Sequence, residues 1–328
     1  MIVTRTPFRV TLGGGATDLP SYYSKYGGFI FAAAIDKYMF IDVNRPKVDD
    51  LIRLKYSETE IVERVEDIKH KVARECLRLT GIEKGIEVSS VADVSAGTGL
   101  GSSSCYGVGL LNALHTFKRE YISLERLAEE EFKIEAEILK RPIGKQDPYM
   151  AAFGGLTVLE IGKDGQVKLR KANVSYETAD ALNENMLLFF TGVRREADEI
   201  LSEQSSGMEK ENKEVLESMY YIKEIGYAIL EAVESDNITE VGRFFDAHWQ
   251  HKKRTSGKIS NPEFDRIYDL ARKNGALGGK ISGAGGGGFF TFYVENNKRK
   301  FREEMKKLGL REMRYRFDFE GTKVLVDF

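Results

Sequence analysis

The chain is short of cysteine, of net charge and of long apolar runs, and each shortage excludes a class of protein. Its 328 residues include two cysteines, Cys76 and Cys105, which are too few for a disulfide framework and are typical of a reducing cytoplasm. The formal net charge is −2, so no overall basic field would attract nucleic acid or an acidic membrane surface. The longest apolar run, residues 29–35, is far shorter than the ~20 residues that a membrane-spanning helix needs. We therefore expect a cytoplasmic protein that has neither nucleic acid nor a membrane as its partner.

The first residues also lack the features of a secretory signal peptide. Residues 1–9 alternate between apolar and polar types and contain no apolar core of the signal-peptide kind. The composition is that of an ordinary globular protein, with 42% hydrophobic and 30% charged residues. The length favours two domains, because a single hydrophobic core stops growing efficiently near ~250–300 residues.

Strand-like and helix-like stretches occur in both halves of the chain, a pattern that predicts two α+β domains. The strand-like stretches are rich in β-branched and aromatic residues, and the helix-like stretches repeat apolar residues at helical spacing. We expect strands at residues 2–12, 28–35, 39–44, 86–94, 156–161, 167–172, 186–190, 288–294 and 323–328. We expect helices at about 58–80, 104–119, 123–140, 195–234, 237–252, 261–274 and 297–308. A change in pattern near 175–185 predicts a division into domains of residues 1–178 and 179–328.

Residues 97–104 carry the strongest functional pattern in the chain. They follow the expected strand 86–94 and precede an expected helix, so their glycines can bring backbone N–H groups close to an anion. The start of the helix adds unpaired N–H donors and the positive end of the helix dipole. Three successive serines supply hydroxyls that can bind phosphate or hydrated Mg²⁺. The pattern favours a phosphate-binding loop over a simple turn, although the lysine of a Walker motif is absent.

A second glycine-rich string, residues 283–288, has the spacing of a dinucleotide-binding fingerprint. That fingerprint needs a helix after its glycines, whereas residues 289–294 form a β-type run. The sequence therefore argues against a nicotinamide-dependent oxidoreductase. Two uses of the string stay open, a close approach to a bound ligand and tight packing between domains.

Two acidic residues occupy positions that suggest a specific role for the carboxylate. Glu135 falls among the inward positions of the expected helix 123–140, where an acid must be paired, bound to a cation or able to reach solvent. Asp147 precedes Pro148 after a helix breaker, so it is a candidate N-cap that can also face a ligand. Arg9 and Asp18 flank the first glycine triplet and can line the same cleft.

Three motifs stand in order along nearly the whole chain: residues 6–18 (TPFRVTLGGGATD), 97–104 (GTGLGSSS) and 280–288 (KISGAGGGG). Together they resemble the motifs of the GHMP superfamily of small-molecule kinases, which contains galactokinase, homoserine kinase, mevalonate kinase and phosphomevalonate kinase. With the first motif, residues 143–147 (IGKQD) and 258–262 (KISNP) look most like the D-glycero-D-manno-heptose 7-phosphate kinase branch. The resemblance implies an N-terminal domain like domain 2 of ribosomal protein S5, a ferredoxin-like C-terminal domain and an active site in the cleft between them.

The resemblance also implies an activity and a set of site residues. The activity is transfer of the ATP γ-phosphate to the anomeric hydroxyl of D-glycero-D-manno-heptose 7-phosphate, giving the 1,7-bisphosphate on the way to nucleotide-activated heptose, with ATP and Mg²⁺ as cofactors. By position, Asp147 matches the catalytic base, Arg9 the basic residue that keeps it ionised, and Ser103 and Glu135 the Mg²⁺ ligands. The residues that match ATP-binding positions are Gly97, Thr98, Gly99, Leu100, Gly101, Ser102, Ser103 and Ser104. Those that match substrate-binding positions are Gly14, Gly15, Thr17, Asp18, Asp147, Gly285 and Gly286.

Some features leave alternatives to the heptose kinase. The second motif usually has a proline where this chain has Ser95, a change that costs loop rigidity but no chemistry. The candidates for the basic pocket that a substrate phosphate needs are Arg194, Arg195, Lys252, Lys253 and Lys258. One alternative is another sugar 1-kinase, of the fucose or galactose type, that acts on an unphosphorylated sugar. A second is a non-catalytic regulator that binds nucleotide or sugar, which the presence of Asp147, Arg9 and Glu135 disfavours.

Overall fold

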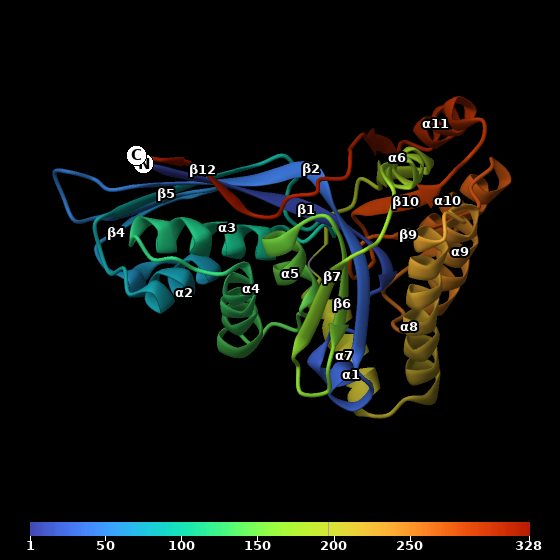
Figure 1. Ribbon diagram of the computed structural model, residues 1–328, viewed down its shortest axis with the longest axis horizontal. Helices are drawn as coiled ribbons and strands as arrows, with labels where there is room; N and C mark the ends of the chain where they lie inside the picture. The colour runs from blue at the N-terminus through green and yellow to red at the C-terminus, as the bar shows by residue number, and fades with distance from the viewer. Residues whose placement is uncertain (196) are drawn as a thin grey trace.

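The computed structural model describes residues 1–195 and 197–328, with helices and strands in both halves of the chain (Figure 1). The strands are β1 (Ile2–Gly14), β2 (Gly28–Asn44), β3 (Ile52–Lys55), β4 (Thr59–Val62), β5 (Ile86–Ala92), β6 (Leu156–Ile161), β7 (Val167–Lys171), β8 (Met186–Phe190), β9 (Gly278–Ile281), β10 (Phe289–Tyr293), β11 (Arg311–Met313) and β12 (Lys323–Asp327). The helices are α1 (Pro20–Tyr26), α2 (Lys71–Thr80), α3 (Ser102–Phe117), α4 (Leu124–Phe132), α5 (Gln146–Phe153), α6 (Tyr176–Asn185), α7 (Asp198–Glu209), α8 (Lys213–Glu234), α9 (Thr239–Lys253), α10 (Pro262–Lys273) and α11 (Lys298–Lys307), with a 3₁₀ turn η1 (Val65–Asp67) and a π-helix η2 (Lys133–Ile138). The predicted α+β class is confirmed.

The described strands form two sheets, and the larger one joins the two ends of the chain. Its eight strands follow the order β12-β1-β2-β5-β3-β4, with the hairpin of β6 and β7 attached to β2. Strand β12 pairs antiparallel with β1, so Ile2 lies opposite Asp327, and the two termini lie side by side in Figure 1. The smaller sheet has the order β11-β8-β10-β9. The predicted division at residue 178 falls within α6, and we propose it as the approximate boundary between an N-terminal and a C-terminal part, with β12 returning to the first.

Helices cover one face of the larger sheet and connect it to the rest of the molecule. Helix α3 is buried along nearly its whole length because it lies between the sheet and the helices α2, α4 and α5 (Figure 1). Helix α8 contacts β1 and β2, so residues such as Ile229 and Val233 belong to the same apolar core as the sheet. A second core, which includes Trp249 and Phe290, lies around the smaller sheet. No helix in the described part of the chain is long and apolar enough to cross a membrane.

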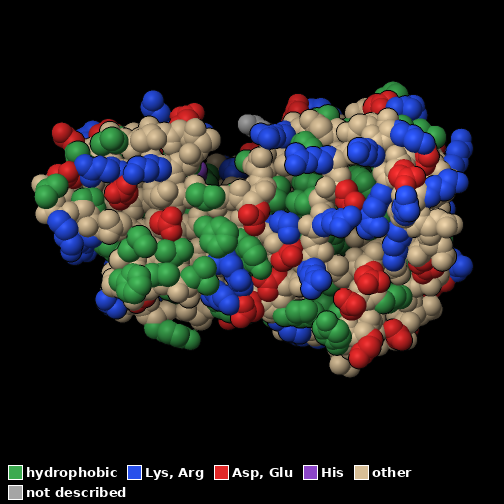
Figure 2. All heavy atoms as spheres, turned by 90° about the horizontal axis from the view of Figure 1, so that it is seen from above, with side chains coloured by type: hydrophobic (Ala, Val, Ile, Leu, Met, Phe, Trp, Pro, Cys, Tyr) green, Lys and Arg blue, Asp and Glu red, His purple; other side chains and the backbone are tan. Residues whose placement is uncertain are grey.

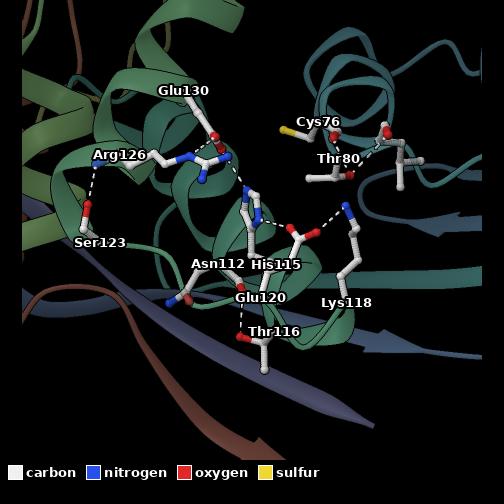
Figure 3. Close-up of polar contacts among 11 residues, drawn as sticks. Cys76, Thr80, Asn112, His115, Thr116, Lys118, Glu120, Ser123, Arg126 and Glu130 are labelled. Carbon is white, nitrogen blue, oxygen red and sulfur yellow. Dashed lines mark hydrogen bonds and ion pairs between the residues drawn. The ribbon is translucent and has the colours of Figure 1, made fainter.

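The C-terminal end of α3 is tied to α4, the helix that leads to Glu135 (Figure 3). The Nε2 atom of His115 lies 2.8 Å from Glu130 Oε2, and its Nδ1 atom lies 2.9 Å from Glu120 Oε2. The hydrogen bond to Glu130, with help from Glu120, raises the pKa of His115. Ser123 caps α4, since its hydroxyl accepts a hydrogen bond from the backbone N–H of Arg126 at 3.2 Å. These contacts fix the position from which η2 presents Glu135.

Most predicted elements are present with shifted ends, but two predicted helices are not single helices. The predicted helix 58–80 begins as strand β4, which pairs with β3, and only its second half is the helix α2. Ile61, which supported the helical pattern, is 60% exposed, so it does not belong to an apolar helix face. The predicted helix 195–234 is divided into α7 and α8 at Glu211, which has a φ of +53°. Residue 196 of that prediction lies outside the described residues.

Candidate active site

A cavity of about 1230 Å³ lies where the three glycine-rich motifs meet. Residues of β1, of the loop before α3, of α5 and of the loop between β9 and β10 line it. In the space-filling view the surface is hollowed between a smaller and a larger part of the molecule (Figure 2). The fold therefore gathers motifs that are far apart in the sequence around one hollow, as expected for a small-molecule site.

The second and third glycine motifs pack backbone against backbone beside this cavity. A Cβ atom on Gly99 would lie 2.6 Å from the carbonyl oxygen of Ser282, and one on Gly283 would lie 2.7 Å from the carbonyl oxygen of Gly99. Gly99 and Gly283 also have φ angles of +79° and +64°, which glycine adopts without strain. Of the two uses left open for the string 283–288, tight packing is therefore present, and β10 rather than a helix follows the string.

Arg9 and Asp147 form a two-pronged ion pair at the cavity. The Nε atom of Arg9 donates to Asp147 Oδ1 at 2.7 Å, and its Nη2 atom donates to Oδ2 at 2.8 Å. The remaining nitrogen, Nη1, donates to the carbonyl oxygen of Gly99 at 2.7 Å. Asp147 is not the N-cap of α5, a position taken by Lys145, but lies in the first helical turn. Because the guanidinium holds both oxygens, the carboxylate has one fixed orientation beside residues 97–104, which we call the glycine–serine loop.

Gln146 connects the two aspartates of the site. Its Oε1 atom accepts the hydroxyl of Thr11 at 2.9 Å, so its Nε2 atom is the one that donates to Asp147 Oδ1, at 2.8 Å. Its backbone N–H donates to Asp18 Oδ2 at 2.9 Å. Sequence reasoning missed Gln146 as a functional residue, although it lies inside the quoted segment 143–147.

The carboxyl group of Asp18 is buried and carries a strongly shifted pKa. Burial raises this pKa to about 6, the backbone N–H of Gln146 opposes the shift, the charge of Asp147 adds to it and Arg9 opposes it. A group of this kind changes its charge within a pH range where proteins are stable. Asp18 lines the cavity, so its protonation alters the charge that a ligand meets there.

Asp18→Asn is expected to stabilise the folded protein at pH 7.5 and to have little effect at pH 4. Between the usual pKa and about 6 the folded state keeps a proton that the unfolded state has lost, so stability falls as the pH rises through this window. Above pH 6, ionisation of the buried carboxyl group lowers the free energy of unfolding by up to about 3 kcal/mol. Asparagine has no charge and avoids this loss, and its side-chain oxygen can still accept the hydrogen bond from the Gln146 N–H. Thermal unfolding of both proteins at the two pH values measures the difference, and equal shifts at both would contradict it.

Glu135 lies in the π-helix η2 and faces the serines at the start of α3. Its side chain is buried, so the interpretation in which it reaches solvent is wrong. Ser103 donates its hydroxyl to Oε1, and Ser104 donates to Oε2 at 3.2 Å. The guanidinium of Arg141 contacts the same Oε1 atom and lies 2.9 Å from Ser103 Oγ. Irregular turns of this type are frequent at functional sites, because they redirect a side chain without ending the helix.

A second buried acid, Glu131, lies one turn before Glu135. Neither carboxyl oxygen of Glu131 has a hydrogen-bond partner among the described residues. Burial, and next the charge of Glu135, raise the pKa of Glu131 well above its usual range. The raised pKa favours the neutral form of Glu131, which lies beside the carboxyl group that faces the serines.

The structure brings most of the predicted site residues to the cavity. Those that line it are Arg9, Gly14, Gly15, Asp18, Gly97, Gly99, Gly101, Ser102, Ser103, Ser104, Glu135, Asp147 and Gly285. Those that do not are Thr17, Thr98, Leu100 and Gly286. The hydroxyl of Thr17 is buried and donates to the carbonyl oxygen of Phe29 at 2.7 Å, while the N–H of Gly286 donates to the carbonyl oxygen of Ile259 at 2.9 Å. Thr17 and Gly286 therefore make hydrogen bonds to neighbouring backbone and do not line the cavity.

Three aromatic residues that sequence reasoning missed line one side of the cavity. The ring of His70 stacks on Tyr106 with centroids 4.6 Å apart, and Tyr56 meets His70 edge-on at 4.8 Å. Burial lowers the pKa of His70, which keeps its ring neutral near pH 7. Together they form an apolar wall with flat faces, a surface suited to a planar ring. No local pattern in the sequence indicated this group, because Tyr56 lies just before the segment 58–80 that was predicted as one helix, and His70, the N-cap of α2, lies within it.

A cluster of buried basic side chains ties the first motif to the third. Lys280 donates to the carbonyl oxygen of Leu12 at 2.6 Å, and Lys252 donates to that of Ile281 at 2.8 Å. The Nε2 atom of His248 lies 2.7 Å from the carbonyl oxygen of Gly14. Burial, and next the charge of Arg9, lower the pKa of Lys252 to about 7.

The five basic candidates for a phosphate pocket separate into two groups. Arg194, Arg195 and Lys252 line the cavity. Lys253 instead pairs with Asp265 at 3.0 Å, and Lys258 pairs with Glu199 at 2.6 Å.

Comparison with known proteins decides the family. The GHMP kinases N terminal domain matches residues 51–155, and the GHMP kinases C terminal domain matches residues 229–309. The chain is 31% identical to D-glycero-alpha-D-manno-heptose 7-phosphate kinase of Campylobacter jejuni, a match that covers 98% of this chain and 97% of the relative. The chain belongs to the GHMP kinases. As a GHMP kinase it is an ATP-dependent phosphotransferase that acts on a sugar.

Other GHMP kinases resemble the chain at lower identity. Galactokinase of Pyrococcus furiosus is 26% identical over 91% of this chain and 90% of its own length. The crystal structure of a D-glycero-D-manno-heptose 1-phosphate kinase from Bacteroides thetaiotaomicron superposes with a TM-score of 0.82 and 22% identity, covering 100% of both chains. This structural match extends the GHMP kinase fold over the whole molecule.

Proposed function

We propose that this GHMP kinase transfers the γ-phosphate of ATP to the anomeric hydroxyl of D-glycero-D-manno-heptose 7-phosphate. The observation that carries the reaction is the carboxylate of Asp147, which Arg9 holds at the cavity beside the glycine–serine loop. The match to the Campylobacter jejuni kinase over nearly the whole chain supports the heptose 7-phosphate as the substrate.

In this proposal Asp147 accepts the proton of the attacking hydroxyl. Its side chain is 30% exposed, so a hydroxyl in the cavity can reach a carboxylate oxygen. Arg9 orients the carboxylate, and its charge offsets negative charge that develops on the transferred group. Most of the catalysis in phosphoryl transfer comes from such positioning and neutralisation.

In this proposal the glycine–serine loop binds the phosphates of the nucleotide, and the apolar wall of Tyr56, His70 and Tyr106 binds its base. The N–H groups and serine hydroxyls at the start of α3 are suited to the phosphates, and Tyr56, His70 and Tyr106 are suited to the base. Glu135 and Ser103 would hold Mg²⁺, which neutralises charge on the β- and γ-phosphate oxygens when bound. The donor set fits this ion, because it consists of carboxylate and hydroxyl oxygens that already contact a cation, the guanidinium of Arg141.

The phosphate of the substrate requires its own basic residues. Arg194, Arg195 and Lys252 are the candidates at the cavity. The pKa of Lys252 is about 7 in the absence of a ligand, and a phosphate nearby would favour its charged form. We therefore propose that Lys252 contributes to binding of the 7-phosphate.

Release of ADP over a panel of heptoses, hexoses and their phosphates tests the substrate. We expect kcat/KM for D-glycero-D-manno-heptose 7-phosphate to exceed that for free mannose, galactose or fucose by about 10²-fold or more. Phosphorus NMR of the product would place the new phosphate on the anomeric oxygen. If the protein phosphorylates a free sugar and no 7-phosphorylated heptose, the proposed substrate is wrong and the free sugar takes its place. ATP binding without turnover of any sugar would favour a non-catalytic regulator.

A further inference from the structure

The glycine–serine loop contains no lysine, so a cation that offsets the charge of an ATP triphosphate must come from another part of the fold. Arg9 reaches the loop at Gly99, but its guanidinium is held by Asp147. Arg141 contacts the loop at the start of α3, where its Nη1 atom lies 2.9 Å from Ser103 Oγ. A positive charge is therefore already present where the helix start favours phosphate.

The fold brings Arg141 to this position by a sharp reversal of the chain. Helix α4 continues into η2, and Lys140 then adopts a φ of +55°. The backbone N–H of Arg141 consequently donates to the carbonyl oxygen of Glu135 at 2.9 Å. The side chain of Arg141 thus lies against the carboxylate of Glu135, although the two residues are not neighbours on one regular helix face.

Arg141 uses the same oxygens that a metal ion would use. Its Nη1 atom contacts both Ser103 Oγ and Glu135 Oε1. A divalent cation on these two oxygens would meet the guanidinium at close range, where two positive charges repel strongly. The metal ion and the present position of Arg141 therefore exclude each other.

Asp198 gives Arg141 a second anchor that does not depend on the metal ligands. The Nε and Nη2 atoms of Arg141 donate to the carboxylate of Asp198 at 3.1 and 3.0 Å. Asp198 is the first residue of α7 and lines the same cavity as Glu135. With this edge held, the Nη1 edge is the part of the guanidinium that can leave Glu135 and turn toward a phosphate.

We propose that Arg141 is a positioning residue for the metal–nucleotide complex. Without a ligand its guanidinium occupies the metal position and holds Glu135 and Ser103 together. When the complex binds, the metal takes these oxygens and Arg141, retained by Asp198, pairs with the phosphates that arrive with it. The inference relies on the proposed function for the identity of the metal ligands. It implies that the metal binds well only together with the nucleotide.

Binding of Mn²⁺ to the nucleotide-free protein, followed by electron paramagnetic resonance, tests the exclusion. Arg141→Gln is expected to bind Mn²⁺ about tenfold more tightly than the wild type, because the competing cation is gone. The double variant Arg141→Gln, Glu135→Gln should lose this gain. Mn²⁺ affinity in Arg141→Gln no higher than in the wild type would overturn the proposal.

Binding of Mg-ATP, measured by calorimetry, tests the second half of the exchange. Arg141→Gln is expected to lower the affinity for Mg-ATP by about tenfold, and Arg141→Lys to recover part of that loss. Arg299→Gln, on the exposed face of α11, is the control and should leave the affinity unchanged. Mg-ATP affinity that rises in Arg141→Gln by as much as the Mn²⁺ affinity would overturn the phosphate contact, because the variant would then have lost only the competing cation. If Arg141→Gln does not fold, Arg141→Met, which also lacks the charge, replaces it in both comparisons. Asp198→Asn removes only the second anchor and leaves the metal ligands intact, so it is expected to weaken Mg-ATP in the same direction. Both readouts are independent of the sugar, so a failure of the proposed substrate leaves them interpretable.

Discussion

Asp147→Asn is expected to lower kcat by about 10²–10⁴-fold while Mg-ATP affinity stays close to that of the wild type. The asparagine has the same shape and keeps one oxygen for the guanidinium of Arg9, but it cannot take a proton from the attacking hydroxyl. A loss confined to kcat is the pattern of a group that acts in the transition state rather than in ground-state binding.

Steady-state kinetics together with calorimetric titration of Mg-ATP separates this effect from misfolding. Arg9 is buried and loses its charged partner in the variant, so thermal unfolding must be recorded alongside. Asp180→Asn, at an exposed position of α6, is the matched control and should keep wild-type turnover. Turnover near the wild-type rate in Asp147→Asn would show that another group accepts the proton.

Glu135→Gln is expected to reduce kcat/KM by about 10²-fold or more and to raise the Mg²⁺ concentration needed for half-maximal rate. The amide has no charge with which to bind the ion, and it leaves Ser103 and Ser104 facing a neutral group. A titration of Mg²⁺ at fixed ATP gives both quantities.

The same π-helix supplies the control for this variant. Glu137 is exposed, so Glu137→Gln removes one negative charge from η2 without touching the cavity. We expect its Mg²⁺ dependence to match that of the wild type. If Glu135→Gln showed the same unchanged dependence, Glu135 would not be a metal ligand.

Local order in the sequence was enough to predict the main parts of the site. A strand, alternating glycines, serines and a helix follow one another within residues 86–117, so the strand–loop–helix order around the glycine–serine loop could be predicted without tertiary contacts. The same reasoning separated the string 283–288 from a dinucleotide site, because the strand after it was visible in the sequence. The family resemblance predicted that Arg9 lies beside Asp147, and the structure shows the ion pair between them.

The features that the sequence did not predict depend on distant partners. Strand β3 pairs in parallel with β5, so the hairpin of β3 and β4 is held by residues about 30 positions away, and its helical spacing of apolar residues was misleading. Arg141 was missed because its role depends on Asp198, in another helix, and on the irregular turn of η2. No local pattern of apolar residues reports either contact.

The pairing of β12 with β1 has a consequence for the order of events during synthesis. Strand β1 carries Arg9 and begins the sheet, but its outer neighbour leaves the ribosome only after every other described element has been made. Until then β1 has an open edge, which offers unpaired backbone groups to other chains. We therefore expect the nascent protein to depend on chaperones, and a truncation that removes residues 323–328 to aggregate rather than to accumulate as a folded kinase.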